Sequence, residues 1–268
     1  MTRRERVLAA LSHRPPDRLP VDFGSTAVTG MHVSCVAALR DYYGLEKRPV
    51  QVHEPYQMLG WIDDDLKDVL GLDVEGVFPR KTLFGFSNRN WKMWRLPDGL
   101  EVLVPEDFRT TVDSNGDLLI YPEGDLTAPP SGRMPHDGWF FDTIVRQPPI
   151  DEEHLNPEDN LEEFTPFSDE DLEHFRQAVT AAAATGRAVM ACFGGAAFGD
   201  IALIPGQALK RPRGIRDVTE WYMATHSRRD YVRRVFERQC EIGLANLARI
   251  HAVVGDNIDA VYVCGADF

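Results

Sequence analysis

Apolar residues along this chain alternate between two patterns, one with helical spacing and one in short, nearly continuous runs. Short apolar runs bounded by Gly or Pro are typical of strands covered on both faces of a parallel sheet. We expect four such strands, which begin near Leu19, Asp73, Arg187 and Ile258. Strands that alternate with helical segments predict an α/β protein.

The first helix has a clear start signal. Thr2 and Glu5 have the spacing of a capping box, which predicts a helix that turns Val7, Leu8 and Leu11 toward the core. Five further helices are expected, at about residues 31–43, 55–70, 168–186, 215–226 and 228–254. Between the strands, these helices would provide the crossovers that parallel strands need.

Polar and small residues define the ends of the later helices. Ser168 and Ser227 are candidate N-caps, because a hydroxyl oxygen can accept from a free backbone N–H. Gly71 and Gly255 follow the last apolar positions of two helices, where a left-handed cap is expected.

Residues 81–167 have a different pattern. Short β-type segments flank Asp98-Gly99 and Asn115-Gly116, which are dipeptides favoured in tight hairpin turns. A connection rich in Pro and acidic residues then leads to residue 167. We interpret 81–167 as an antiparallel β insertion with a linker, and a separate small domain is the alternative.

Four strand–helix units are half of what a closed (β/α)8 barrel requires. The chain ends just after the fourth apolar run, with no helix to cover it. We therefore expect residues 1–268 to be a single TIM-barrel-type domain, truncated after about four units. An open four-stranded sheet is the alternative.

Composition limits the partners of this protein. The formal net charge of −13 is unfavourable for binding phosphate backbones, so we do not expect a nucleic-acid partner. The four cysteines lie far apart, and the N-terminal apolar run is too short for a signal peptide or a membrane span. These features predict a reduced, cytoplasmic protein that does not enter the membrane.

The order of several segments resembles the uroporphyrinogen decarboxylase superfamily, which includes methyltransferases that act with corrinoid proteins. The segments that carry the resemblance are MTRRERVLAALSHRPPDRLPVDF, GLDVEGV, ACFGGAAFGDIALIPG and IDAVYVCGADF. The resemblance covers most of the chain except 81–167. It implies a (β/α)8 barrel with its active site at the carboxyl ends of the strands.

Two departures separate this chain from true decarboxylases. Those proteins have an arginine-rich stretch after the first strand, whereas this chain reads GSTAVTGMHV. They also have an aspartate after the second strand, where this chain has Pro79 and Arg80. The resemblance is therefore greater to the corrinoid-dependent methyltransferases. Tetrapyrrole decarboxylation and a non-catalytic binding protein or fragment are the alternatives.

The methyltransferases bind zinc through a His-x-Cys motif and a distant Cys, and zinc activates the acceptor thiol. No His-x-Cys occurs in this chain, and the family places that motif beyond residue 268. We therefore expect no metal site in this chain, with zinc and a corrinoid belonging to the full-length parent. His32 and Cys35 have a spacing that can hold a metal, but two ligands are weak evidence. A small molecule or a corrinoid protein is the expected partner, and a homodimer is considered.

Candidate site residues lie where the predicted strands end. Asp267 is the first candidate for a catalytic residue, and Asp22 is the second, because each carboxylate can accept a proton at a strand end. A structural role, either capping the following turn or helix or forming an ion pair, would explain both aspartates equally simply. The candidate substrate-binding residues are Phe193, Gly194, Gly195, His53, Tyr56, Arg211 and Arg213. The last two belong to a basic cluster with Lys210 and Arg216, which could also be a solvated loop.

Overall fold

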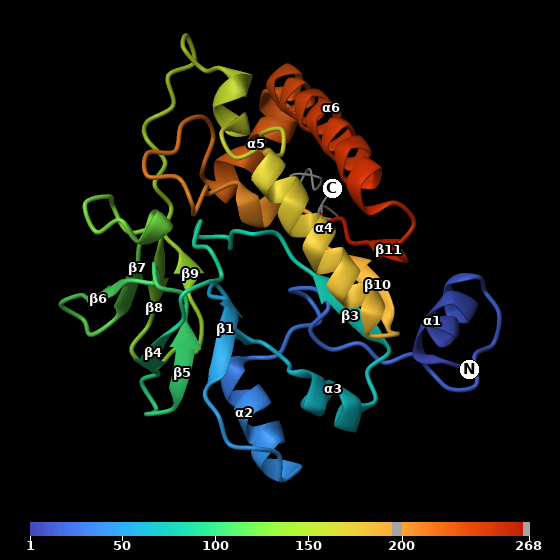
Figure 1. The fold of residues 1–268 in the computed structure, drawn as a ribbon. Coiled ribbons are helices and arrows are strands. Elements are labelled where there is room, and N and C mark those ends of the chain that lie inside the picture. The colour runs from blue at the N-terminus through green and yellow to red at the C-terminus, as the bar shows by residue number, and fades with distance from the viewer. Residues whose placement is uncertain (195–199, 265–268) are drawn as a thin grey trace.

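The computed structural model describes residues 1–194 and 200–264 of the chain. It is a mixed α/β protein with small, open sheets (Figure 1). The helices are α1 Arg3–Leu11, α2 Val33–Tyr42, α3 Asp64–Leu70, α4 Asp169–Ala184, α5 Val218–Ser227 and α6 Arg229–Val254. The strands are β1 Val50–Glu54, β2 Leu59–Gly60, β3 Val74–Val77, β4 Lys92–Arg95, β5 Glu101–Val104, β6 Thr110–Val112, β7 Leu118–Ile120, β8 Gly132–Met134, β9 Asp142–Thr143, β10 Ala188–Ala191 and β11 Ala260–Val261.

Three of the four expected parallel strands form one sheet, in the order β11-β10-β3. β10 pairs in parallel with both neighbours, and Met190 lies opposite Gly76 on one side and Ala260 on the other. Helices α4 and α6 cover one face of this sheet, where Phe175, Val179, Ile250 and Val254 join one apolar cluster. The alternation of strand and helix in the sequence therefore predicted this part of the fold correctly.

The expected strand near Leu19 does not form. Pro20 has no N–H to donate, and the N–H of Val21 bonds to the carboxylate of Asp73 at 2.9 Å instead of to a strand. Leu19 is exposed, and the chain bends sharply after Asp22. No sheet within the described residues closes into a barrel.

The predicted helix at 55–70 is shortened to α3. Residues 55–63 instead form a turn and strand β2, because Met58 has a positive φ of 53° and ends any helical path there. Ile62, Leu66 and Val69 have the spacing of one helical face, but only Ile62 and Leu66 are buried and Val69 is exposed. Gly71 caps the helix in the left-handed conformation, as predicted.

Most of the residues predicted to cap helices do so. Thr2 and Glu5 make the capping box of α1, and Ser168 makes one with Asp171 at the start of α4. Ser227 was misassigned, because it is the last residue of α5, and Arg228 precedes α6. The prediction of which face of α1 is buried was also wrong, because Arg6 and Ala9 are buried and Leu11 is exposed.

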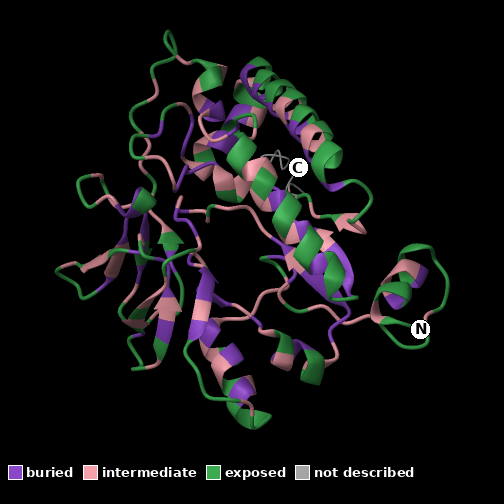
Figure 2. Cartoon of the chain, in the orientation of Figure 1, coloured by how far each residue is buried: buried purple, intermediate pink, exposed green. Residues whose placement is uncertain are grey.

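The β-rich insertion has both predicted hairpins, with β4 paired to β5 and β6 paired to β7. β5 also pairs in parallel with β1, which precedes the insertion. A single apolar cluster extends from Val33 and Val50 to Phe84, Phe108 and Phe141. The insertion therefore shares its core with residues 33–72. Figure 2 shows that β1, β3 and β10 are among the most buried parts of the chain.

The N-terminal segment is attached to the parallel sheet through one carboxylate. Asp73, which is fully buried just before β3, accepts from Arg6 at 2.7 Å and from Arg18 at 2.8 and 2.9 Å. It also accepts from the N–H of Val21. Arg6 is 7% exposed, so its charge depends on Asp73 and on the half-exposed Asp17.

Replacing Asp73 by Asn should lower the free energy of unfolding by about 3 kcal/mol, because a buried guanidinium loses a charged partner. Urea unfolding at neutral pH measures this change. The matched control is Glu101→Gln, which removes an exposed carboxylate from β5 and should cost less than about 0.5 kcal/mol. Equal values for the two variants would contradict this role of Asp73.

Candidate functional site

A cavity of about 460 Å³ lies at the carboxyl ends of the three parallel strands. We call it the strand-end cavity. Its wall includes residues that directly follow these strands, namely Phe78, Pro79, Cys192, Phe193, Gly194, Tyr262 and Cys264. Residues from outside the sheet complete the wall, among them His53, Glu54, Asn88 and Gln207.

Strand register explains which side chains face the cavity. Met190 pairs with Ala260, so Cys192 and Tyr262 follow at equivalent positions and on the same face of the sheet. The N–H of Tyr262 donates to the carbonyl of Ala191 at 2.9 Å, which extends this pairing beyond β11. The thiol of Cys192 lies 3.8 Å from the carbonyl oxygen of Ser25.

Segment 22–26 packs against the same face of the sheet. A Cβ atom on Gly76 would lie 2.7 Å from the carbonyl oxygen of Ser25, so this strand position must lack a side chain. Asp22 accepts from the hydroxyl of Ser25 at 2.5 Å and is half-buried near Cys192. This close approach brings the N-terminal segment to the edge of the cavity.

Glu54 is a carboxyl group on the wall of this cavity. Burial raises the pKa of Glu54 to about 7, although its two oxygens accept from the N–H groups of Tyr56 and Gln57 at 2.8 Å each. The two backbone donors fix the orientation of the carboxyl group. A carboxyl group with a pKa near neutrality can both donate and accept a proton at physiological pH.

Two amide oxygens in the wall have no hydrogen-bond partner among the described residues: Oδ1 of Asn88 and Oε1 of Gln207. Gln207 is 2% exposed, and its Nε2 donates to Thr143 and to the carbonyl of Ala202. The Nδ2 of Asn88 donates to the carbonyl of His53 at 2.8 Å. Buried acceptors without donors are costly unless a ligand or water supplies the donor, so both oxygens are available to accept a hydrogen bond from a ligand or from water.

The cavity has little free positive charge. Arg80 pairs with Glu170 at 2.9 Å and Asp171 at 3.0 Å, and Lys81 pairs with Glu123 at 3.2 Å. His53 is neutral, because burial and the nearby Lys67 lower its pKa to about 4. A ligand with several carboxylates would find no unpaired cation on the described wall of this cavity.

The residues predicted from the sequence are only partly brought together. His53, Phe193 and Gly194 line the cavity, and Asp22 lies beside it. Phe193 is also a core residue that packs edge-on against Phe175. Asp267 and Gly195 lie outside the described residues.

The other predicted residues lie elsewhere. Tyr56 packs against the core of the β insertion. Arg213 pairs with Asp159 and Glu162, both at 3.0 Å, and the neighbouring Arg211 is exposed. Neither arginine lines the strand-end cavity. The basic cluster is thus divided among separate carboxylates, since Lys210 pairs with Asp125 and the buried Arg216 pairs with Glu162 and Glu163.

Sequence reasoning missed Glu54, Asn88 and Gln207. The alternation in Val50-Gln51-Val52-His53-Glu54 was a strand signal that would have placed Glu54 at a strand end. No local pattern marks Asn88 or Gln207, because their unpaired oxygens arise from contacts with distant segments. Their significance is visible only in three dimensions.

No three His, Cys, Asp or Glu side chains among residues 1–194 and 200–264 gather closely enough to hold a metal ion. The described residues therefore do not fit the zinc that the resemblance implies. His32 instead caps α2, with its ring bonded to Ser34 and to the carbonyl of Trp139. In the same part of the chain, no helix has both the length and the apolar character needed to cross a membrane.

Comparison of the chain with family models, with curated proteins and with solved structures gave no match in any of the three. The site must therefore be interpreted from its own geometry.

The raised pKa of Glu54 predicts a pH-dependent stability. A carboxyl group whose pKa is higher in the folded state binds more protons there, so unfolding becomes easier as pH rises from about 4.5 to about 7. Glu54→Gln should remove this part of the pH dependence, as measured by urea unfolding at several pH values. Glu101→Gln is the control and should keep it. Parallel pH profiles for wild type and Glu54→Gln would contradict the assignment.

Cys192 should be a slow nucleophile. Burial and the charge of Asp22 raise the pKa of its thiol to about 12, so little thiolate forms at pH 8. In the folded protein, iodoacetamide should alkylate the exposed Cys35 at least about tenfold faster than Cys192. Mass spectrometry of timed digests measures both rates. Faster labelling of Cys192 would show that the thiol is activated.

Proposed function

We propose that this chain belongs to a methyl-transferring enzyme of the uroporphyrinogen decarboxylase superfamily, and that β3, β10 and β11 are consecutive strands of a (β/α)8-type barrel. The order of these strands in the sheet follows their order in the chain, with α4 between the first two and α5 and α6 between the last two. A cavity at the carboxyl ends of the strands is where barrels of this type place their active site. Of the four sequence segments that resemble the superfamily, GLDVEGV contains β3, IDAVYVCGADF contains β11, and ACFGGAAFGDIALIPG begins at the last residue of β10.

The observation that carries the reaction class is a half-buried carboxyl group of near-neutral pKa on the wall of a cavity without unpaired cations among the described residues. Decarboxylation of a polycarboxylate needs cations that pair with the carboxylates, and Arg80 and Lys81 are already paired. Methyl transfer has a different requirement. When a methyl group leaves an ether or thioether, the departing oxygen or sulfur takes the electron pair of the broken bond and needs a proton.

Glu54 can supply that proton. Its protonated form is well populated at neutral pH, and the N–H groups of Tyr56 and Gln57 fix the direction of its carboxyl group. A corrinoid, when bound, supplies the nucleophile that accepts the methyl group. Asn88 and Gln207 would orient the donor by accepting its N–H or O–H groups with their unpaired oxygens. The zinc of the methyltransferase branch has no part in this proposal.

The test supplies the protein with cob(I)alamin and two methyl donors, and follows the formation of methylcobalamin by its absorption spectrum. A methoxyaromatic donor releases an oxyanion that needs a proton, whereas tetramethylammonium releases a neutral amine that needs none. We expect Glu54→Gln to slow transfer from the methoxyaromatic donor by about 100-fold and to leave transfer from tetramethylammonium unchanged. Glu101→Gln should leave both rates unchanged.

Release of CO2 from uroporphyrinogen, without methylation of cobalamin from either donor, would refute the proposal and favour decarboxylation. Equal losses with both donors in Glu54→Gln would show that the carboxyl group positions the donor and does not protonate a leaving group.

A further inference from the structure

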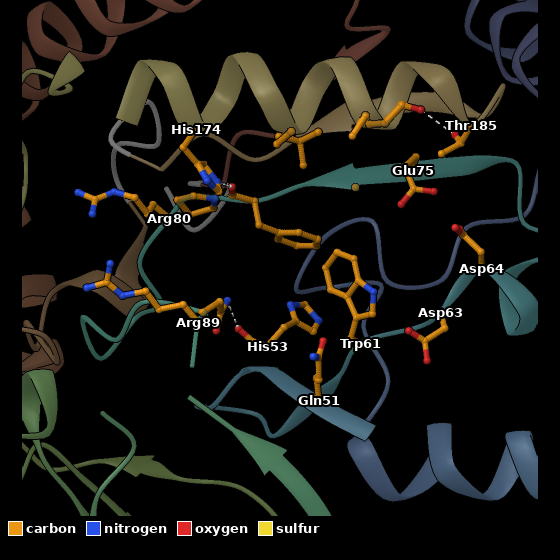
Figure 3. A pocket seen from close by; sticks show the side chains of 18 of the residues that line it. Gln51, His53, Trp61, Asp63, Asp64, Glu75, Arg80, Arg89, His174 and Thr185 are labelled. Carbon is orange, nitrogen blue, oxygen red and sulfur yellow. Dashed lines mark hydrogen bonds between the residues drawn. The ribbon is translucent and has the colours of Figure 1, made fainter. Parts of the chain in front are cut away.

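A second and larger cavity, of about 720 Å³, lies between α4, β3 and β1 (Figure 3). We call it the Trp61 cavity. It shares His53, Phe78, Pro79, Arg80 and Asn88 with the strand-end cavity, and its other lining residues include Trp61 and Arg89. Its volume is within the range of sites that bind small molecules. Of its wall residues, the proposed methyl transfer uses Asn88 alone.

Three rings form the centre of this cavity. His53 lies edge-on to Trp61 with ring centroids 5.5 Å apart, and Phe78 lies 4.9 Å from His53 and 6.1 Å from Trp61. Figure 3 shows His53 and Trp61 directed toward one another within the cavity. Trp61 is only partly buried. A flat aromatic ligand can therefore pack against these rings in offset or edge-on contact.

His53 is the polar side chain at this centre. It is 6% exposed, and its ring nitrogens make no hydrogen bond to any residue that the structure describes. In its neutral state, the ring offers one N–H donor and one acceptor nitrogen. The unpartnered Oδ1 of Asn88 adds a second acceptor to the same wall. A heteroaromatic ring with polar atoms on its edge can satisfy these groups, whereas a hydrocarbon ring cannot.

Charge is distributed unevenly around the three rings. Figure 3 shows the guanidinium groups of Arg80 and Arg89 on one side of the cavity and Asp63, Asp64 and Glu75 on the other. The carboxylates are neutralised, for example Glu75 by Lys67 and Arg187. At the basic side, Arg80 is paired with Glu170 and Asp171.

Arg89 is exposed and makes no ion pair with a described residue, so its charge is available to a ligand. An arginine in this position favours an anion such as phosphate or carboxylate. An anionic arm could thus reach Arg89 while the ring of the ligand occupies the aromatic centre.

We propose that the Trp61 cavity is a binding site for a planar heteroaromatic ligand with an anionic arm, which is the chemistry of a nucleotide. The ring packs against Trp61 and Phe78 and exchanges hydrogen bonds with His53 and Asn88. The phosphate pairs with Arg89.

Isothermal titration calorimetry tests this site with two ligand pairs, AMP with adenosine and FMN with riboflavin. We expect saturable binding of AMP or FMN. Arg89→Gln should weaken the binding nucleotide by about tenfold and leave its nucleoside unchanged, because only the nucleotide has the phosphate. His53→Phe should weaken both members of that pair by about tenfold, because it keeps a ring but removes the hydrogen bonds.

Two controls make the result decisive. Arg95→Gln removes an exposed arginine of β4 and should not change the affinity. Thermal melting should show that His53→Phe is folded, because the substitution replaces one planar ring by another in the same place. Absence of saturable binding of both nucleotides, or affinities within about twofold of wild type in both cavity variants, would refute the site. The titrations contain no corrinoid or methyl donor, so their outcome is independent of the proposed methyl transfer.

Discussion

The buried carboxylate of Asp73 is the interaction on which the arrangement of this protein depends. It lies just before β3 and accepts from Arg6 of α1, from Arg18 and from the backbone of Val21. These contacts hold the N-terminal helix and the following segment against the amino end of the parallel sheet. A buried charge persists only when its partners are in place, so this contact specifies one path of the chain from α1 to β3.

That path determines what happens at the opposite end of the strands. Once Val21 is held beside Asp73, residues 22–26 must cross the sheet face at Gly76, where only a glycine leaves enough space. The crossing brings Asp22 and Ser25 close to Cys192. The ion pairs at the amino ends thus provide stability, while the carboxyl ends are left free to form a cavity.

The polar side chains in and around the two cavities differ in whether all of their hydrogen-bonding atoms have partners. Glu75 and Arg216 are buried, and each has several charged or carbonyl partners. His53 and Gln207 are also buried and Asn88 is half-buried, and the Oδ1 of Asn88 and the Oε1 of Gln207 have no partner among the described residues. Since a protein loses stability by keeping such atoms, the second group is where a ligand is expected.

The sequence by itself determined the local elements of this protein. Capping residues and glycines gave the ends of α1, α3 and α4, and the apolar runs gave β3, β10 and β11, because these signals act between residues close in the chain. The hairpins of the insertion were predictable for the same reason.

Only the tertiary structure decided the rest. Leu19 was expected to start a strand, but the backbone N–H of Val21 donates to the carboxylate of Asp73, which lies 52 residues away in the chain. The site shows the same division. Phe193 and Gly194 could be chosen from a predicted strand end and His53 from its place before a predicted helix, whereas Arg213 pairs with carboxylates that are distant in the chain. The near-neutral pKa of Glu54 and the free oxygens of Asn88 and Gln207 depend on burial and on contacts between remote segments, and no local pattern in a sequence records either.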